Sequence, residues 1–253
     1  MKKKKPSLTY RFIKGLVRLF YPKMQVIGGE NLPQEPCIVV GNHSHAHGPI
    51  ACELYFPGTR YTWCIGQMMH KEEVPEYAMR DFWPNKKWYS RWFYKLLSHI
   101  IAPIAQCVFT NANTIPVYRD SRTITTFKQT VKRLEEGASI VIFPEEDAKY
   151  NHFLYQLHQN FVDVAKLYYR RTGKTVSFVP LYIAPKLHKM YIGKPVAFDP
   201  EADIASERKR ITNAMLEGIT EIAVNLPKHT VIPFHVMPKS EYPCNKPENC
   251  PTK

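Results

Sequence analysis

The sequence of 253 residues lacks a long uninterrupted run of apolar residues. Its longest stretch without a charged residue, 96–118, contains Pro103 and several polar side chains, which a membrane-spanning helix would expose to lipid. The segment after the first lysines is interrupted by Arg11, Lys14 and Arg18, so it lacks the apolar core of a secretory signal. We therefore expect neither a secretory signal nor a transmembrane helix.

The sequence also has few cysteines, and none of them forms a CxxC pair. Two of the six, Cys244 and Cys250, lie in a proline-rich C-terminal region, where pairing is open. The other four lie in apolar segments, which is typical of buried reduced thiols: Cys37, Cys52, Cys64 and Cys107. The pattern excludes the disulfide framework of a small secreted domain and favours a reducing, cytoplasmic setting.

Acidic residues are scarce relative to basic ones. The chain has 22 Asp and Glu against 35 Lys and Arg, which gives a formal net charge of +13. This balance predicts an anionic partner: a phospholipid surface, a phosphorylated substrate or a nucleic acid. No recognised nucleic-acid-binding motif is present, and the basic residues concentrate near the N-terminus and at 86–95. The charge therefore favours a membrane surface with anionic lipids and no nucleic acid.

Two segments combine basic and aromatic residues. In 1–23, four lysines precede a helical pattern with apolar residues on one side and arginine and lysine on another, which predicts a basic amphipathic helix that associates with membranes. In 82–104, tryptophans and tyrosines lie beside lysines and arginines, a composition typical of the lipid headgroup layer. Both patterns also fit helices packed on a protein core, and the second fits stacking on single-stranded nucleic acid.

The rest of the chain alternates apolar strands with helical patterns. Strands are predicted at 24–28, 37–41, 60–66, 113–118, 139–143, 176–184 and 189–193, and helices at 121–136, 152–171 and 204–226. This order predicts an α/β fold, with a mainly parallel sheet flanked by helices and an N-terminal amphipathic helix. We expect one domain over 24–226, followed by a proline-rich tail, 227–253, that is extended and loosely ordered.

The most informative segment is GNHSHAHGPI, which directly follows the buried strand 37–41. Sites in open α/β sheets form outside the carboxyl ends of strands, so Asn42 and His43 are placed for catalysis. A histidine near neutrality accepts a proton from an attacking hydroxyl and returns it to a leaving group. A zinc site built from His43, His45 and His47 is the alternative, although the flanking glycine and proline favour a turn over a strand.

Four segments in order resemble the glycerolphosphate and lysophosphatidic acid acyltransferase family. GGENLPQEPCIVVGNH at 28–43 is similar to that family's entry phrase and its N-H motif. TIPVYRD at 114–120, FPEEDA at 143–148 and FVPLYIA at 178–184 resemble the next three blocks. The order and approximate spacing agree from about residue 20 to residue 200.

The resemblance implies a role for each matching residue. His43 would be the general base that deprotonates an acceptor hydroxyl, and Asn42 would shape the turn that presents it. Arg119 would hold a phosphate or another anion, and Glu145 would orient the acceptor. The co-substrate would be acyl-CoA or an acylated acyl carrier protein, with no metal or other cofactor.

The chain also departs from the family's pattern. Gly48 stands where the family has the Asp that orients the catalytic imidazole, and the nearest polar substitutes are His45, His47 and Glu53. In the third block, 146–148 reads Glu-Asp-Ala in place of Gly-Thr-Arg, which makes the pocket less attractive to a phosphate. We therefore expect a less anionic or amine-bearing acceptor.

The resulting prediction is a peripheral enzyme at the cytoplasmic face of a membrane. It would transfer a fatty acyl group from a thioester to a lysophospholipid or a related lipid-like acceptor. The rival hypothesis is an acyltransferase-like protein that has lost catalysis and binds lipid, because the orienting Asp is missing.

Overall fold

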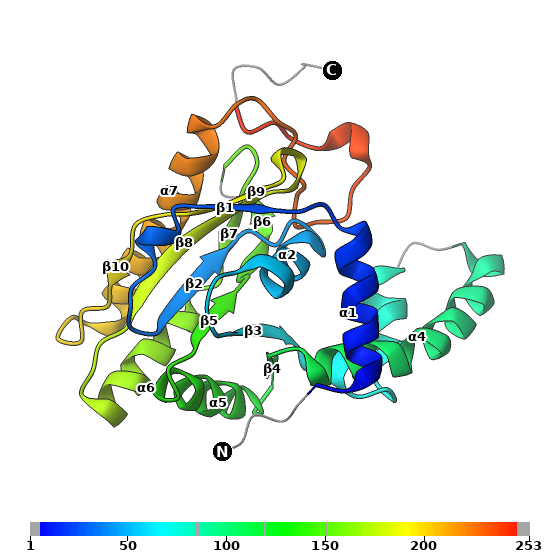
Figure 1. Ribbon diagram of the computed structural model, residues 1–253, viewed down its shortest axis with the longest axis horizontal. Helices are drawn as coiled ribbons and strands as arrows, with labels where there is room; N and C mark the ends of the chain where they lie inside the picture. The colour runs from blue at the N-terminus through cyan, green and yellow to red at the C-terminus, as the bar shows by residue number, and fades with distance from the viewer. Residues whose placement is uncertain (1–5, 84–86, 119, 150, 247–253) are drawn as a thin grey trace. The chain divides into compact units, whose positions relative to one another are not determined.

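The computed structural model describes residues 6–83, 87–118, 120–149 and 151–246 (Figure 1). The chain forms two compact units. Unit 1 comprises 1–21 and 61–129, and unit 2 comprises 22–60 and 130–253. The lysine run at 2–5, the predicted anion-binding Arg119 and residues 247–253 lie outside the described residues.

Unit 2 is built on a mixed sheet with strand order β1-β9-β8-β2-β5 and β10 beside β8. β2 runs parallel to β5 and β8, and β1 runs parallel to β9, whereas β9 and β10 are antiparallel to β8. This arrangement confirms the predicted α/β class with a mainly parallel sheet. The bounds are β1 Gln25–Ile27, β2 Cys37–Gly41, β5 Ser139–Ile142, β8 Ser177–Ala184, β9 Lys189–Ile192 and β10 Val196–Ala197.

The composition of β2 explains its central place in the sheet. All five of its residues are buried, and it has a hydrogen-bonded neighbour on each side. A strand buried on both faces needs a continuous apolar run, and CIVVG supplies one. The long neighbour β8 is apolar in the same way and is buried from Phe178 to Ala184.

The helices of unit 2 are α2 His47–Tyr55, α6 Asp163–Thr172 and α7 Ile204–Asn225. α7 begins at Asp203, whose side chain accepts hydrogen bonds from the backbone N–H groups of Ala205 and Ser206 at 3.0 Å each. It lies along β8 (Figure 1) and buries one stripe at helical spacing. The fully buried members of that stripe are Ile211, Met215, Ile219 and Ala223.

Two helix predictions in unit 2 need correction. The predicted helix 152–171 is helical only in α6, because Tyr155–Leu157 forms strand β7, which pairs antiparallel with β6 (Glu145–Lys149). The alternation of buried Tyr155, exposed Gln156 and buried Leu157 is the two-residue period of a strand. α2 was not among the predicted helices, since Gly41 and Pro49 indicate a turn; proline is nevertheless tolerated in the first turn of a helix.

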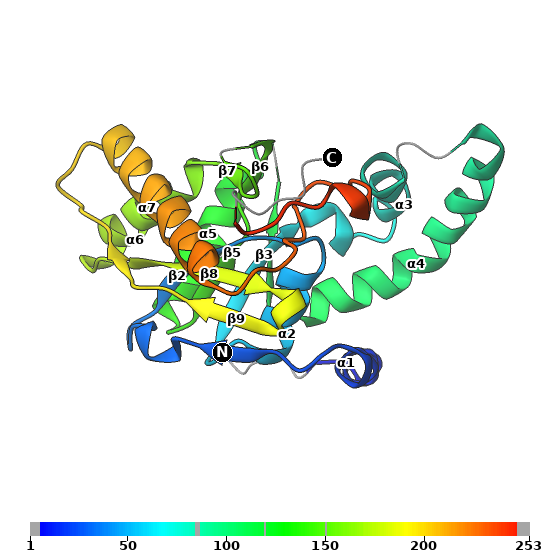
Figure 2. The same cartoon turned by 90° about the horizontal axis from the view of Figure 1, so that it is seen from above.

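The prediction of a loosely ordered tail is wrong for 227–246. This segment turns back toward the start of α2 (Figures 1 and 2) and carries a bridge between Thr230 and Cys244. Apolar burial explains the order, because Val231, Ile232 and Cys244 are buried.

Unit 1 contains helices α1 Leu8–Phe20, α3 Val74–Tyr77 and α4 Arg91–Asn111, and the parallel strand pair β3 (Arg60–Ile65) and β4 (Thr114–Val117). α1 is the predicted N-terminal amphipathic helix, capped by Ser7, whose side chain accepts from the N–H of Tyr10 at 3.2 Å. The division between the units falls within α5, Thr123–Glu135. Short 3₁₀ turns occur at Gly29–Asn31, Gly66–Met69, Trp88–Ser90, Asn160–Val162, Pro185–Leu187 and Lys239–Glu241, and a π turn at Ala78–Phe82.

α4 is continuous although Pro103 lies inside it. In the described part of the chain, one segment of 24 residues, Trp88–Asn111, is long and apolar enough to cross a membrane, and 17% of its most apolar window is buried. Length and composition alone are weak evidence for a span, because core helices of soluble proteins meet the same criteria. Pro103 therefore does not break the helix, while the charge-free stretch 96–118 leaves it after Asn111 and continues into β4; the expectation that no transmembrane helix is present stays a prediction.

Candidate active site

The predicted catalytic residues meet at the carboxyl ends of two adjacent strands. β2 and β5 pair in parallel from Ile38 opposite Ile140 to Val40 opposite Ile142. The chain then leaves β2 at Asn42 and His43, and leaves β5 at Phe143 on the way to Glu145. The first and third motif segments therefore converge at the sheet edge where α/β proteins place their sites, a convergence that was not predicted from the sequence.

Asn42 locks the chain as it leaves β2. Its side chain is buried, its Nδ2 donates to the Ile183 carbonyl at 3.0 Å, and its Oδ1 accepts from the Ile183 N–H at 2.6 Å. Nδ2 also donates to Oγ of Ser44 at 2.8 Å. An amide carries both a donor and an acceptor, so it continues the β2–β8 ladder by one step and holds the following turn.

That turn has an unusual backbone. Ser44 and His45 have φ angles of 47° and 52°, in the left-handed region that non-glycine residues rarely adopt. Such a residue costs roughly 1–2 kcal/mol, so the surrounding hydrogen bonds must hold the turn. One of them runs from the Gly48 N–H to the His43 carbonyl at 3.0 Å.

Gly48 is where the turn closes most tightly. A Cβ atom at this position would lie 2.6 Å from the His43 carbonyl oxygen, 2.9 Å from the Phe143 ring and 3.0 Å from the Asn42 carbonyl oxygen. A side chain at position 48 would therefore collide with the backbone of this turn.

Glu145 is joined to His43 through the backbone. Its Oε1 accepts a hydrogen bond from the His43 N–H at 2.6 Å, and the residue is only 6% exposed. Burial raises the pKa of Glu145 to about 7, although the hydrogen bond from His43 acts in the opposite direction. The carboxyl group therefore exchanges its proton near neutral pH.

The His43 imidazole is enclosed by aromatic rings. The Phe143 ring lies 5.3 Å away at an interplanar angle of 69°, and the Phe234 ring lies 5.7 Å away at 71°, both edge-on. Burial lowers the pKa of His43 to about 4; the His45 backbone opposes this shift and the His45 charge adds to it. The ring is therefore neutral at physiological pH and able to accept a proton.

Nδ1 of His43 is buried and has no hydrogen-bond partner among the described residues. Two of the polar residues considered above as partners for His43 are engaged elsewhere: Glu53 forms an ion pair with Arg60 at 2.6 Å, and Nε2 of His45 lies 3.1 Å from the His235 carbonyl oxygen. Burial lowers the pKa of His47, the first residue of α2, with the charges of His45 and Lys186 acting the same way. Neither Glu53 nor His45 forms a hydrogen bond with Nδ1 of His43.

The three histidines of the motif are not arranged like metal ligands on a strand face. They occupy a turn and the first residue of α2. Within the described ranges, no group of three or more His, Cys, Asp or Glu side chains is placed to hold a metal ion.

The second motif segment belongs to unit 1. Arg122, three residues after Arg119 in the sequence, donates to the Asp120 carboxylate at 2.7 to 3.0 Å and lies 3.9 Å from the centre of the Tyr118 ring. Its guanidinium is therefore engaged by its own neighbours.

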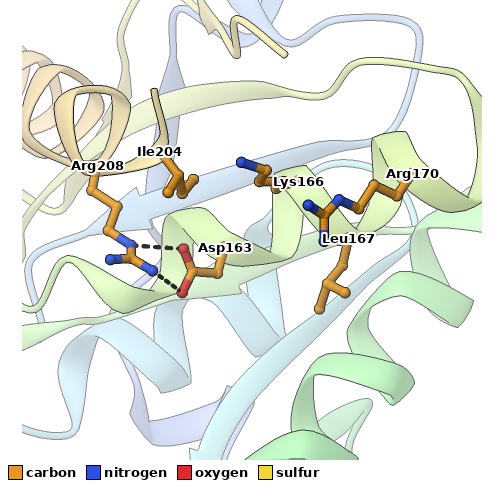
Figure 3. Close-up of a pocket in the computed structure, with 6 residues that line it drawn as sticks. All are labelled: Asp163, Lys166, Leu167, Arg170, Ile204 and Arg208. Atoms are coloured by element: carbon orange, nitrogen blue, oxygen red, sulfur yellow. Dashed lines mark hydrogen bonds and ion pairs between the residues drawn. The ribbon is translucent and has the colours of Figure 1, made fainter. Parts of the chain in front are cut away.

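A pocket of about 250 Å³ lies away from these motifs, between α6 and α7 (Figure 3). Arg208 donates two hydrogen bonds of 2.7 Å to the Asp163 carboxylate across it. The pocket contains none of the predicted site residues; its lining is Asp163, Lys166, Leu167, Arg170, Ile204 and Arg208.

Sequence reasoning missed Phe234. Nothing in the proline-rich segment around it signals a contact with His43, which lies far away along the chain. Phe143 was in view as part of the third motif segment, but its contact with the imidazole was not predicted.

No protein-family model matches the sequence, and no curated protein matches it. Among solved structures, the fold is similar to the crystal structure of the 1-acyl-sn-glycerophosphate (LPA) acyltransferase PlsC from Thermotoga maritima. The TM-score is 0.50 at 16% sequence identity, and the match covers 87% of this chain and 80% of that one. The chain thus has the α/β fold of an acyltransferase.

Proposed function

We propose that this chain is an acyltransferase that moves a fatty acyl group from a thioester to a lysophospholipid or a related lipid-like acceptor. The observation that carries the proposal is the pairing of His43 with Glu145 at adjacent strand ends. The fold around this pair is similar to that of an enzyme named for acyl transfer to a lysophospholipid.

The proposed reaction uses His43 as the general base. Nε2 takes the proton from the acceptor hydroxyl while that oxygen attacks the thioester carbonyl carbon, since Nδ1 is buried. The carbon–sulfur bond then breaks, and the leaving thiolate takes the proton back from the imidazolium. Acyl-CoA or an acylated acyl carrier protein supplies the thioester, and no other cofactor is required.

Glu145 supports this reaction by holding the backbone of His43 from the start of β6. A base displaced by about 1 Å loses much of its effect, so a 2.6 Å anchor contributes to the rate. Because Nδ1 has no carboxylate partner among the described residues, we expect slower turnover than in a site with an orienting Asp.

The acceptor is proposed from the motif residues. Arg119 would bind an anionic group, and the acids that replace Gly-Thr-Arg at 146–148 would disfavour additional phosphate charge. A lysolipid with a zwitterionic or amine-bearing headgroup satisfies both conditions.

The proposed place of action is the cytoplasmic face of a membrane, with peripheral attachment. α1 exposes Phe12, Leu19 and Phe20. The 3₁₀ turn before α4 exposes Trp88, and α4 itself exposes Trp92 and Phe93, close in sequence to Arg91 and Lys95. Aromatic and basic side chains together suit the headgroup layer of an anionic bilayer. The net charge of +13 acts in the same direction.

The test is acceptor-dependent release of free thiol. Protein with anionic liposomes is given acyl-CoA or an acylated carrier protein and a panel of lysolipid and amine acceptors. We expect release that is lost in His43→Asn and retained in the matched variant His188→Asn, because His188 is exposed and asparagine tolerates its left-handed backbone. Equal release by wild type and His43→Asn would contradict the proposal.

The second candidate function is a lipid-binding protein without catalysis. It is favoured by the unpartnered Nδ1 of His43 and by Gly48 in place of the family's Asp. The same assay separates the two functions, because this candidate predicts lysolipid binding with no thiol release from any donor.

A further inference from the structure

The C-terminal loop, defined here as Thr230–Cys244, has closed ends. Thr230 and Cys244 form an antiparallel bridge, and the Val231 N–H donates to the Pro243 carbonyl at 2.9 Å. A surface loop whose ends are tied together in this way holds its shape and frequently carries function.

The base of the C-terminal loop is fixed to unit 2 by two buried polar residues. Nε2 of His229 lies 2.7 Å from the Tyr182 hydroxyl on β8, and the His229 N–H donates to Oδ1 of Asn245 at 2.8 Å. Nδ2 of Asn245 in turn donates to the Ala223 carbonyl of α7 at 2.8 Å. Buried polar groups with all these partners are costly to displace, so the loop is anchored on both β8 and α7.

The far side of the C-terminal loop reaches the candidate active site. The Phe234 ring meets the His43 imidazole edge-on at 5.7 Å and the Tyr155 ring of β7 at 6.0 Å. Next to it, the His235 carbonyl oxygen lies 3.1 Å from Nε2 of His45, whose ring is 6.0 Å from that of Tyr242. The loop therefore touches two residues of the motif turn.

We infer that Phe234 is a positioning residue for His43. The imidazole meets the rings of both Phe143 and Phe234 edge-on, and these two contacts restrict its rotation about the Cβ–Cγ bond. This restriction supplies part of the orientation that a carboxylate on Nδ1 would otherwise supply, and Nδ1 has no partner in the described ranges. The inference deepens the proposed function and rests on it for its kinetic test.

The kinetic test compares variants of the C-terminal loop. Phe234→Ala removes the ring, Phe234→Tyr keeps it, and Val236→Ala changes an exposed side chain of the same loop. We expect Phe234→Ala to lower kcat for thiol release about tenfold, the change that corresponds to one lost aromatic contact, with KM little changed. Phe234→Tyr and Val236→Ala should remain near wild type.

A second readout is independent of activity. NMR titration of the His43 ring, assigned by its loss in His43→Asn, reports its environment directly. Removing Phe234 admits water, so the pKa of His43 should rise from about 4 toward its ordinary value of 6.5. The titratable groups around the turn, Glu145, His45 and Lys186, are unchanged in the variant and in its Val236→Ala control.

Two results would overturn the inference. One is a Phe234→Ala enzyme as active as wild type or more active, which would make the loop neutral or inhibitory. The other is an unchanged His43 titration in Phe234→Ala. Absence of thiol release in the wild-type protein would instead contradict the proposed function. The NMR titration would still decide whether Phe234 positions the His43 imidazole.

Discussion

At the scale of single residues, the environment of His43 and Glu145 predicts two opposing effects of pH on stability. The pKa of Glu145 is raised to about 7, so the folded state keeps a proton that the unfolded state releases, and the free energy of unfolding falls as pH rises from 4.5 to 7. The pKa of His43 is lowered from 6.5 to about 4, so the unfolded state binds a proton more readily than the folded state does. The free energy of unfolding therefore decreases as the pH falls from 6.5 to 4. The two slopes oppose each other over their shared range.

In Glu145→Gln, the pH dependence of the free energy of unfolding that comes from His43 should no longer be opposed by that of Glu145. Glutamine keeps an acceptor for the His43 N–H but does not ionise, so relative to wild type the variant should gain up to about 3 kcal/mol between pH 4.5 and pH 8. Urea unfolding across that range measures the difference, with Glu221→Gln on the exposed side of α7 as control. Parallel pH profiles for wild type and Glu145→Gln would mean that the carboxyl group is not buried as described.

Gly48 gives a second prediction at this scale. Gly48→Ala places a Cβ 2.6 Å from the His43 carbonyl oxygen, so we expect a loss of about 1–3 kcal/mol in the free energy of unfolding. Gly15→Ala is the matched control, because no atom lies within 4 Å of its added Cβ and alanine favours a helix. Chemical denaturation of both variants checks the prediction, which is wrong if the two lose equal stability.

Some residues of the site could be predicted from the sequence next to them, whereas others depend on contacts between distant parts of the chain. Asn42, His43 and Glu145 were predicted, because each directly follows or lies close behind an apolar strand, and parallel strand ends meet at one edge. The contact of Phe234 with His43 depends on the path of the C-terminal loop, which is set by buried hydrogen bonds from His229 and Asn245. No periodicity in the sequence encodes those bonds.

At the scale of elements, the apolar strands were predicted to within one or two residues because buried parallel strands need continuous apolar runs. The errors occurred where a segment fits both a helical and a strand pattern, or where a helix accommodates a proline or glycine. β7 was absorbed into a predicted helix, and α2 was missed because Gly41 and Pro49 indicate a turn. Pro103 did not end α4, which continues from Arg91 to Asn111.

The aromatic end of α4 carries the element-scale prediction. Trp88, in the 3₁₀ turn just before α4, and Trp92, in its first turn, are 84% and 67% exposed, so replacing both with alanine should weaken binding to anionic liposomes at least about tenfold. Co-sedimentation measures the loss, and Ile124→Ala removes an exposed apolar side chain of α5 as control. Added salt should weaken wild-type binding further if lysines and arginines also contribute. Equal binding by the double variant and the control would show that this region does not contact the membrane.

At the scale of the whole molecule, composition and motif order predicted the fold class, and the similarity to PlsC from Thermotoga maritima agrees with it. The division into two units was not predicted, because it depends on long-range contacts between segments such as 1–21 and 61–129. The same holds for the folded 227–246 segment, whose prolines suggested an extended tail. Composition describes local preference, whereas these features arise from tertiary packing.

The central claim is that His43 transfers an acyl group, and the most direct measurement follows that group. A thioester with an isotope-labelled acyl chain is incubated with protein, anionic liposomes and a lysolipid acceptor, and the lipid products are analysed by mass spectrometry. The account predicts labelled ester on the acceptor with wild type and none above background with His43→Asn. Label that stays on the thioester, or leaves as free acid equally in both proteins, would contradict it.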